Sequence, residues 1–487
     1  MKPVEEFATL LTEWEAGSGP LYLRLSGAIK SAISNVKIMP GAKLPAERAL
    51  ARELGVSRTT VAQAYDSLRA EGWAESRQGS GTWVRATGES FPGMPGLPPL
   101  LTRAFFRAAD GGHSSVPIDL SVAGPKPLDL VVSTAIRLDL ERVLPALPPT
   151  GYMPFGLPLL RRLLASRFTE GGAPTHEDQI LVTSGAQQAI SLIASMCLQR
   201  GDAVALESPT YAGALDAFSR AGARLVPLPV GRGGVDVDRL RETVRAVRPR
   251  LVYLMPTFQN PTGEVMSERE RRRISAIADE FQVTVIEDNT LADVSLDGVS
   301  RPPLANYSEG STLISIGSMS KLFWPGLRVG WVRAAEATIA GLGQLKVVND
   351  LGTSVLSQAL ACRLLPETPV ASLARKEELT AKMHVLESGL TEKLPDWTWK
   401  RPRGGLFLWV KVPVEDGRAF AEVALRHGVA ITPGAALSPD GKHDDYVRIC
   451  FVASEEDLQV GVDRLAEAWA SFGWSSTSTP SSVLLPV

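Results

Sequence analysis

The sequence predicts two folded domains of different class: a small α+β domain of short helices followed by a hairpin, and a larger α/β domain with a mostly parallel sheet and a small C-terminal α+β subdomain. Three observations support this prediction. With 487 residues, the chain is too long for one ordinary domain. Seven of the thirteen residues in TGESFPGMPGLPP, from Thr87 to Pro99, are Gly or Pro, and such a stretch sustains neither a helix nor a central strand. The pattern is helical before this stretch, and short apolar strands alternate with helices after it.

These changes in composition define four segments. We expect a first domain over residues 1–86 and a linker over 87–116, which its prolines make semi-rigid. A large domain is expected over 117–472. The segment 473–487, rich in Ser, Thr and Pro, is expected to be a disordered tail.

Charge is unevenly distributed along the chain. Between Pro20 and Arg85, ten Lys/Arg and five Asp/Glu give a net charge of +5, so the remainder carries −7 within a total of −2. A basic segment on an otherwise acidic chain indicates a polyanion partner for that segment. A solvated helical surface explains the charge alone equally well.

Composition excludes several other classes of protein. A hydrophobic content of 44% and a charged content of 21% are typical of a globular protein. The three widely separated cysteines, Cys197, Cys362 and Cys450, predict free thiols rather than a disulfide framework. The sequence has no signal-peptide pattern and no apolar run of about 18–20 residues, so we expect a cytoplasmic protein without a membrane segment or a metal site.

The first domain has the pattern of three helices and a hairpin. Apolar residues recur at helical spacing over 21–36. A second helix over 44–54 is indicated by Pro45 near its first turn, and a third over 57–72 has Ser57 as a good N-cap. The sequence WAESRQGSGTWV, residues 73–84, then alternates like a short hairpin with a glycine-containing tip.

The turn between the second and third helices predicts a helix-turn-helix that reads DNA. The third helix would enter the major groove by its N-terminal end, where Arg58 can give two hydrogen bonds to a guanine. Glycines at the hairpin tip would let the backbone approach a groove closely. The predicted DNA-binding residues are Arg48, Ser57, Arg58, Thr59, Thr60, Gly79 and Gly81. A helical module with surface arginines is the alternative at this stage.

The order of these motifs resembles one family. KLPAERALARELGVSRTTVAQAYDSLRAEGWAESRQGSGTWV is similar to the winged helix of the GntR family, which combines a Pro-x-Glu-Arg start, a Gly-Val-Ser-Arg-x-Thr turn and a Gly-x-Gly wing. The resemblance implies a winged helix-turn-helix fold and a double-stranded DNA operator as partner.

The large domain alternates short apolar strands with helices, a pattern typical of a parallel sheet covered on both faces. The expected strands are ILVT (180–183), AVALE (203–207), LVYLM (251–255), VTVIED (283–288) and TLISIGS (312–318). In such sheets the ligand lies beyond the carboxyl ends of the strands, so the loops that follow them are the candidate site.

The strongest chemical signal is Ser318-Met-Ser320-Lys321, followed by Arg328. A lysine amine forms a Schiff base with a carbonyl, while hydroxyls and a guanidinium bind phosphate. These residues therefore suit a phosphate-bearing aldehyde. A lone lysine in a polar loop is usually a solvated charge, so the assignment of Lys321 as a cofactor lysine depends on further motifs.

Four further loops carry suitable side chains. Ser184-Gly185-Ala186-Gln187 lies between a strand and a helix, where exposed amides form an anion site. Asp288 can keep a pyridine nitrogen protonated, Asn260 can donate to a phenolic oxygen, and Tyr211 can stack on a pyridine ring. Each of these four motifs also has an ordinary structural explanation, namely a tight turn, a helix cap, an Asn-Pro-x-Gly turn or a packed aromatic ring.

In this order, the five motifs resemble the fold-type-I aminotransferases, from about residue 119 to about residue 469. The resemblance implies pyridoxal 5'-phosphate as cofactor, Lys321 as the catalytic Schiff-base lysine and Asp288 as the pyridinium partner. It assigns the remaining cofactor contacts to Asn260, Tyr211, Ala186, Gln187, Ser318, Ser320 and Arg328. It further implies that Tyr152 reaches the phosphate of the partner subunit and that Arg448 binds an effector or substrate carboxylate, with a surface ion pair as the alternative for Arg448.

One position departs from that pattern. The family usually has a tyrosine two or three residues after the pyridinium aspartate, whereas this chain has Thr290. Thr290 would offer its shorter hydroxyl to the phenolic oxygen. Losing the tyrosine donor should raise the pKa of the lysine–cofactor Schiff base, because that donor stabilises the deprotonated form.

The combination of a GntR-like winged helix, a Gly/Pro linker and an aminotransferase-like domain resembles the MocR family, which implies a homodimer. The main hypothesis is a transcription regulator that senses a small amino compound, or pyridoxal phosphate itself, through an aldimine on Lys321. An active aminotransferase with an accessory DNA-binding domain is the alternative, and a repressor that uses the large domain only to dimerise is a third. On the main hypothesis any transaminase activity is weak or residual.

Overall fold

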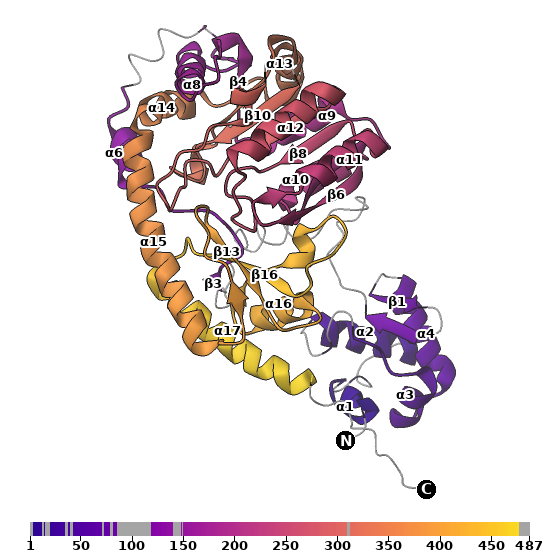
Figure 1. Ribbon diagram of the computed structural model, residues 1–487. Helices are drawn as coiled ribbons and strands as arrows, with labels where there is room; N and C mark the ends of the chain where they lie inside the picture. Colours follow the sequence, from indigo (N-terminus) through magenta and orange to yellow (C-terminus); the bar gives the residue numbers. More distant parts are fainter. Residues whose placement is uncertain are drawn as a thin grey trace. The chain divides into compact units, whose positions relative to one another are not determined.

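The protein is described by a computed structural model that covers residues 3–11, 14, 20–34, 38, 42–70, 73–77, 81–84, 118–139, 148, 150–308 and 312–476. The chain forms two compact units, Met1–Pro99 and Leu100–Val487 (Figure 1). The predicted linker over 87–116 lies outside the described residues.

The first unit contains short helices and one antiparallel hairpin. Its elements are α1 (Pro3–Thr9), α2 (Leu21–Ser34), α3 (Glu47–Glu53), α4 (Arg58–Ala70), β1 (Ala74–Arg77) and β2 (Gly81–Val84). Leu25, Leu50, Val61 and Leu68 are fully buried in one apolar core, which α2, α3 and α4 share. The expected helices over 44–54 and 57–72 are confirmed with slightly shorter bounds.

Local chemistry explains the turn between α3 and α4. Gly55 has a φ of 68°, a left-handed conformation that glycine adopts without steric cost. The hydroxyl of Ser57 accepts a hydrogen bond from the backbone N–H of Thr60 at 3.1 Å, so Ser57 caps α4 as its sequence predicts. The hairpin pairs Ala74 with Val84 and places the side chain of Val84 in the core.

The second unit is built on an eight-stranded sheet with strand order β4-β11-β10-β9-β8-β5-β6-β7. Its strands are β4 (Ile180–Thr183), β5 (Ala203–Ser208), β6 (Arg224–Gly231), β7 (Gly234–Val235), β8 (Leu251–Leu254), β9 (Thr284–Asp288), β10 (Leu313–Ser318) and β11 (Gly330–Arg333). The strands from β10 to β6 are parallel, while β11 is antiparallel to both of its neighbours. All five strands expected from the sequence are present to within one residue.

Helices cover both faces of this sheet. The helices of the second unit are α6 (Asp129–Ile136), α8 (Pro158–Glu170), α9 (Ala186–Cys197), α10 (Ala212–Arg220), α11 (Val237–Val247), α12 (Glu268–Phe281), α13 (Glu336–Asp350), α14 (Val355–Leu364), α15 (Thr368–Lys393), α16 (Gly417–Arg426) and α17 (Glu455–Ser476). In β5, Val204 and Leu206 belong to the core shared with α9 and α10, whereas Ala205 belongs to the core shared with α11 and α12. The alternation of side chains along a strand therefore supplies two apolar layers.

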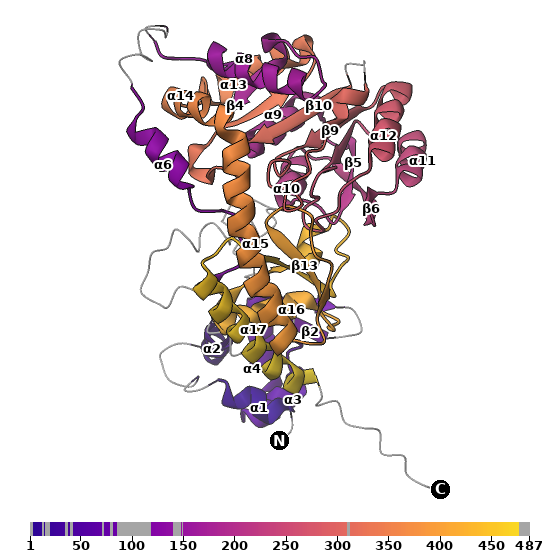
Figure 2. The same ribbon diagram turned by 60° about the vertical axis from the view of Figure 1, so that its left-hand side comes forward.

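A smaller antiparallel sheet completes the second unit. It has the order β12 (Thr398–Trp399), β13 (Phe407–Lys411), β16 (Tyr446–Cys450), β15 (Thr432–Pro433), and a separate parallel pair joins β3 (Ile118–Asp119) to β14 (Val429–Ala430). The long helix α15 runs from the large sheet to this smaller one, alongside α17 (Figure 2). No helix among the described residues is both long and apolar enough to cross a membrane.

The end of α17 differs from the sequence-based boundary. The tail was predicted to begin at residue 473, but the helix continues through Ser476. Trp469 stacks on Phe472 at 6.2 Å between ring centroids, so the last turn before Gly473 is packed. Residues 477–487 lie outside the described part of the chain.

The antiparallel strand β11 passes so close to the loop after β4 that only glycine fits at residue 330. A Cβ on Gly330 would lie 2.8 Å from the carbonyl carbon of Gly185 and 2.9 Å from the backbone oxygen of Gly317. We therefore expect Gly330→Ala to lower the free energy of unfolding by about 1–3 kcal/mol, the usual cost of overpacking. Denaturant unfolding measures this change.

Gly231→Ala is the matched control, because nothing lies within 4 Å of the position of a Cβ on Gly231. Equal stability of the two variants would contradict the close packing of β11.

Candidate functional site

Most of the predicted site residues of the large domain lie at the carboxyl ends of the strands of its large sheet. Because β5, β8, β9 and β10 are parallel, the loops that follow them meet at one edge of the sheet. Asp288 ends β9, Ser318 ends β10, and Lys321 follows three residues later.

Lys321 occupies the centre of this edge. Its Nζ donates a hydrogen bond to the backbone oxygen of Ala123 at 2.7 Å, so the segment after β3 contributes to the site. Burial lowers the pKa of the Lys321 amine from 10.5 to about 8, and Arg448 and Arg328 act in the same direction. Cys450 and Asp288 oppose this shift. A lysine with a lowered pKa has more of the neutral amine that attacks carbonyl groups.

Asp288 is 2% exposed, and hydroxyl groups donate to both of its carboxyl oxygens. Tyr253 donates to Oδ2 at 2.6 Å, and the Thr290 backbone N–H donates to Oδ1 at 2.9 Å. The Thr290 hydroxyl also donates to Oδ1. The contact predicted between the Thr290 hydroxyl and a cofactor oxygen stays a prediction, and in this structure the hydroxyl donates to Asp288.

Tyr253 was not singled out in the sequence. It lies inside the apolar run of β8 and is fully buried, so it resembled an ordinary core residue. Burial, the charge of Asp288 and the hydrogen bond to it hold the pKa of the Tyr253 hydroxyl well above its usual value, so it remains a donor. What the sequence offers for this role is the hydroxyl group of Tyr253 within the apolar strand β8, which lies beside β9, the strand that ends at Asp288.

A group of donors suited to an anion lies beside the lysine. Ala186 begins α9 after Gly185, and no side chain caps the N-terminus of this helix, so its first N–H groups can receive an anion. Arg328 donates from Nη2 to the backbone oxygen of Ser184 at 2.6 Å and is otherwise exposed. The hydroxyls of Ser318 and Ser320 are 2.9 Å apart. These residues form a cluster of backbone amides, hydroxyls and one guanidinium.

Tyr211 and Gln187 contact each other directly. The Tyr211 hydroxyl donates to Oε1 of Gln187 at 3.0 Å, and Nε2 of Gln187 donates to the backbone oxygen of Gly213 at 2.9 Å. Burial, with a contribution from Asp288, raises the pKa of Tyr211 to about 12. Tyr211 is therefore fixed in orientation and uncharged.

Arg448 is 9% exposed and lies in β16 of the smaller sheet. Its Nη1 donates to Oδ1 of Asn260 at 3.0 Å, and its Nη2 donates to the backbone oxygen of Ser121 at 2.7 Å. Its Nε is buried without a hydrogen-bond partner within the described structure. The surface ion pair weighed as an alternative is therefore wrong, because the guanidinium is buried and contacts Asn260.

A second buried carboxyl group, Glu207, was missed by the sequence analysis. Its Oε2 accepts hydrogen bonds from the backbone N–H of Met255 at 2.9 Å and from Nε2 of Gln259 at 3.4 Å, while its Oε1 has no partner among the described residues. Burial raises the pKa of Glu207 to about 8, so the group is mostly protonated at neutral pH. In the sequence Glu207 resembled a polar residue at a strand end.

The chemistry of these donors fits pyridoxal phosphate. Lys321 offers an amine, Asp288 a carboxylate for a ring nitrogen, and the start of α9 with Arg328 an anion site. Tyr152 lies apart from these residues, 57% exposed on the segment before α8.

Of the predicted DNA-binding residues, Arg48 lies in the first turn of α3, Ser57, Arg58, Thr59 and Thr60 lie at the start of α4, and Gly81 begins β2. Arg48, Ser57, Arg58, Thr59 and Gly81 are exposed, and Thr60 is half-buried. Nε of Arg58 donates to Oε2 of Glu47 at 3.1 Å, a contact the sequence did not indicate. Gly79 lies outside the described residues.

Two family models match the two units. The model described as "Bacterial regulatory proteins, gntR family" matches residues 21–84, and the model described as "Aminotransferase class I and II" matches residues 136–465. The protein is therefore a gntR-type helix-turn-helix regulator joined to an aminotransferase class I and II domain.

Relatives with both parts are known. The chain is 30% identical to the "Uncharacterized HTH-type transcriptional regulator YdfD" of Bacillus subtilis, over 92% of this chain and 95% of that protein. It is also 30% identical to the "Probable rhizopine catabolism regulatory protein MocR" of Rhizobium meliloti, over 78% of each. The chain belongs to the MocR family of regulators, as its motifs predict.

The large domain also resembles a solved enzyme structure. The α-aminoadipate aminotransferase LysN of Thermus thermophilus, in complex with N-(5'-phosphopyridoxyl)-L-leucine, aligns with a TM-score of 0.68 and 28% identity. The match covers 77% of this chain and 99% of that one. The fold-type-I aminotransferase architecture is thereby confirmed.

The pKa of Lys321 predicts a pH dependence. Because the neutral amine is the reactive form, the rate at which the cofactor-free protein reacts with pyridoxal phosphate should rise with pH up to about 8 and then level off. Stopped-flow absorption measures this rate. A rate that keeps rising towards pH 10.5, the ordinary lysine value, would show that Lys321 is not desolvated.

Proposed function

We propose that this protein is a DNA-binding transcription regulator that holds pyridoxal phosphate on Lys321 and responds to an amino compound that carries a carboxylate. The observation that carries the proposal is the group formed by the half-buried Lys321 with the buried Asp288 and Arg448, present in the same chain as a helix-turn-helix whose Arg58 is exposed.

Each side chain has a role that its geometry supports. Bound pyridoxal phosphate supplies an aldehyde for covalent attachment and a ring that accepts electrons. Lys321 would provide the amine, and Asp288 would hold a proton on the ring nitrogen. Tyr211 would stack on the ring, and Asn260 would donate to the phenolic oxygen. The phosphate contacts are assigned to Ala186, Gln187, Ser318, Ser320 and Arg328.

Arg448 is the reason for proposing that the effector carries a carboxylate. Its guanidinium is buried, and its Nε has no acceptor among the described residues. A buried donor without an acceptor costs free energy, which a ligand carboxylate would recover. Arg448 lies on the smaller sheet and Asn260 follows β8 of the large one, so such a ligand would contact both.

Self-association is part of the proposal. Large apolar side chains are exposed where α8 begins and where α13 and α14 meet: Tyr152, Leu159, Val348, Leu351 and Leu356, with Val348 88% exposed. The backbone of Gly352 lies close to Met153, which brings these segments together. An exposed apolar surface of this kind marks an interface, and we assign it to a homodimer.

Regulation requires that the effector bind one arrangement of the dimer better than another, because an equal affinity for both would leave the equilibrium between them unchanged. The exposed N-terminal end of α4 in each subunit would then engage the operator differently in the two arrangements.

Transamination is the second candidate function, favoured by the retention of Lys321, Asp288 and Arg448 together. The occupation of the Thr290 hydroxyl by Asp288 argues against efficient turnover, because it leaves one fewer donor for the cofactor. Turnover of an amino acid with a keto acid would place the protein among the enzymes.

Footprinting of the DNA upstream of the gene tests the regulator proposal. We expect site-specific protection whose extent changes when pyridoxal phosphate is added, and no such change with Lys321→Ala. An absence of specific protection with and without cofactor would exclude the proposal.

Arg58→Ala should weaken operator binding by about 1–3 kcal/mol if Arg58 contacts a guanine. The variant should fold normally, because the exposed pair with Glu47 contributes at most about 1 kcal/mol. Gel-shift titration compares specific with nonspecific DNA. The control is Arg239→Ala, an exposed arginine of the second unit that also pairs with a glutamate.

A further inference from the structure

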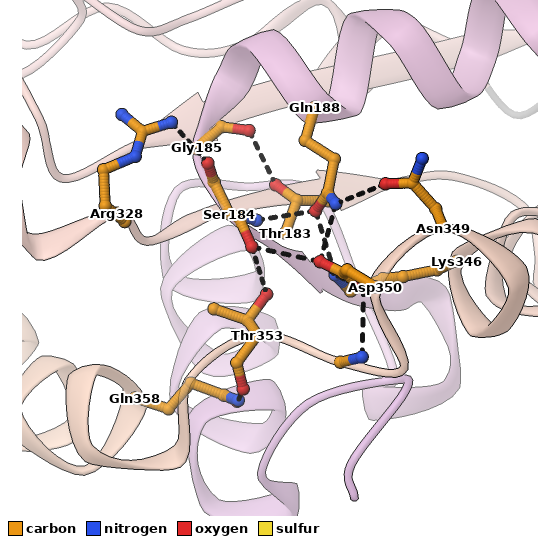
Figure 3. Close-up of polar contacts among 11 residues, drawn as sticks. Thr183, Ser184, Gly185, Gln188, Arg328, Lys346, Asn349, Asp350, Thr353 and Gln358 are labelled. Atoms are coloured by element: carbon orange, nitrogen blue, oxygen red, sulfur yellow. Dashed lines mark hydrogen bonds and ion pairs between the residues drawn. The ribbon is translucent and has the colours of Figure 1, made fainter.

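A polar network inside the second unit ends on the loop before α9 (Figure 3). All three polar groups of Ser184 take part. Its backbone N–H donates to Oε1 of Gln188 at 2.8 Å, its hydroxyl donates to Oδ2 of Asp350 at 3.2 Å, and its backbone oxygen accepts from Arg328 at 2.6 Å. Three hydrogen bonds therefore fix Ser184, the residue before Gly185.

The centre of the network is a lysine with no exposed surface. Nζ of Lys346 donates to both carboxyl oxygens of Asp350, at 2.9 and 2.8 Å, and to Oε1 of Gln188 at 2.9 Å. Nε2 of Gln188 in turn donates to Oδ2 of Asp350 at 2.6 Å. These three residues come from α9 and α13 and form a closed set of hydrogen bonds (Figure 3).

The network extends to the segment that follows α13. The backbone N–H of Gly352 donates to Oδ1 of Asp350 at 3.0 Å, and the hydroxyl of Thr353 lies 3.3 Å from that of Ser184. Gln358 donates to the backbone oxygen of Thr353 at 2.7 Å. Two loops distant in the sequence are thus fixed to one ion pair, in which Lys346 is buried and Asp350 is half-buried.

Such an ion pair contributes little to the stability of the fold, so we infer that it serves to hold neighbouring groups in fixed positions. Lysine is almost never fully buried unless it is paired, and replacing a buried ion pair with apolar residues is often neutral for folding. What the pair supplies here is a fixed acceptor for the Ser184 hydroxyl and a fixed orientation for Gln188. Burial alone would raise the pKa of Asp350, but the hydrogen bonds from Lys346 and Gln188 lower it, so the acceptor stays charged.

We propose that Lys346, Asp350 and Gln188 are positioning residues for the phosphate end of the cofactor, an inference that rests on the proposed function. They act through Ser184: by holding its N–H and hydroxyl, they fix the backbone at Gly185 and Ala186 before the anion arrives. A preformed loop loses less conformational freedom on binding, so affinity for the phosphate group depends on the network.

The test compares pyridoxal phosphate with pyridoxal, which keeps the aldehyde and the ring but lacks the phosphate. Both ligands are titrated by visible absorption into wild-type protein and Lys346→Met. We expect the variant to lose roughly tenfold or more in affinity for pyridoxal phosphate, the scale found when outer-shell partners of a bound group are removed. The affinity for pyridoxal should stay unchanged, because no phosphate contact is involved.

A double variant covers the case in which Lys346→Met leaves Asp350 unpaired and fails to fold. Lys346→Met with Asp350→Leu replaces the ion pair by apolar side chains and should fold, as thermal melting will show. It still removes the acceptor of the Ser184 hydroxyl, so we expect the same selective loss for pyridoxal phosphate.

Lys382→Met is the matched control, because Lys382 is also buried and also pairs with an acidic residue one helical turn away, Glu378. It should lower the affinities for both ligands equally or not at all. Equal losses for both ligands with Lys346→Met, or no loss with the folded double variant, would overturn the inference. Failure of the wild-type protein to take up pyridoxal phosphate would instead overturn the proposed function.

Discussion

The second unit is organised around charged side chains that are removed from water. Asp288 and Arg448 are both nearly buried, and an unpaired buried charge costs several kcal/mol. Each is therefore surrounded by groups of opposite polarity: Tyr253 and Thr290 at Asp288, and Asn260 and backbone oxygen atoms at Arg448. These partners come from different strands and loops, so the charges can be stabilised only when the whole sheet edge is assembled.

The elements that build this edge were predictable because their signals are local. A run such as ILVT or TLISIGS between turn residues predicts a buried strand, and the order of such runs predicts a parallel sheet. The position of Lys321 directly after a strand, with Asp288 at the end of another, follows from the same reading. Ser57 as a helix cap likewise depends only on its immediate neighbours.

The residues that were missed depend on contacts between distant segments. Tyr253 has the sequence pattern of a core residue, and its role is visible only once β8 lies beside β9. Lys346 lies in α13, where a lysine normally faces solvent, yet its ammonium group is buried and donates to Asp350 and Gln188. The hydrogen bond from the Thr290 hydroxyl to Asp288, at the end of the strand before it, is likewise a contact that the sequence did not indicate. No periodicity in the sequence carries this information.

The two units have separate apolar cores: Leu25, Leu50 and Val61 belong to one, and Leu206, Ile286 and Ile316 to another. Substitutions at sites that share no neighbours have nearly additive effects on stability. Changes on the exposed face of α4 can therefore accumulate over evolutionary time without disturbing the buried charges around Lys321. In a lineage of duplicated genes, operator preference and ligand preference are free to diverge at different rates, which makes this architecture a source of regulators with new pairings of signal and target.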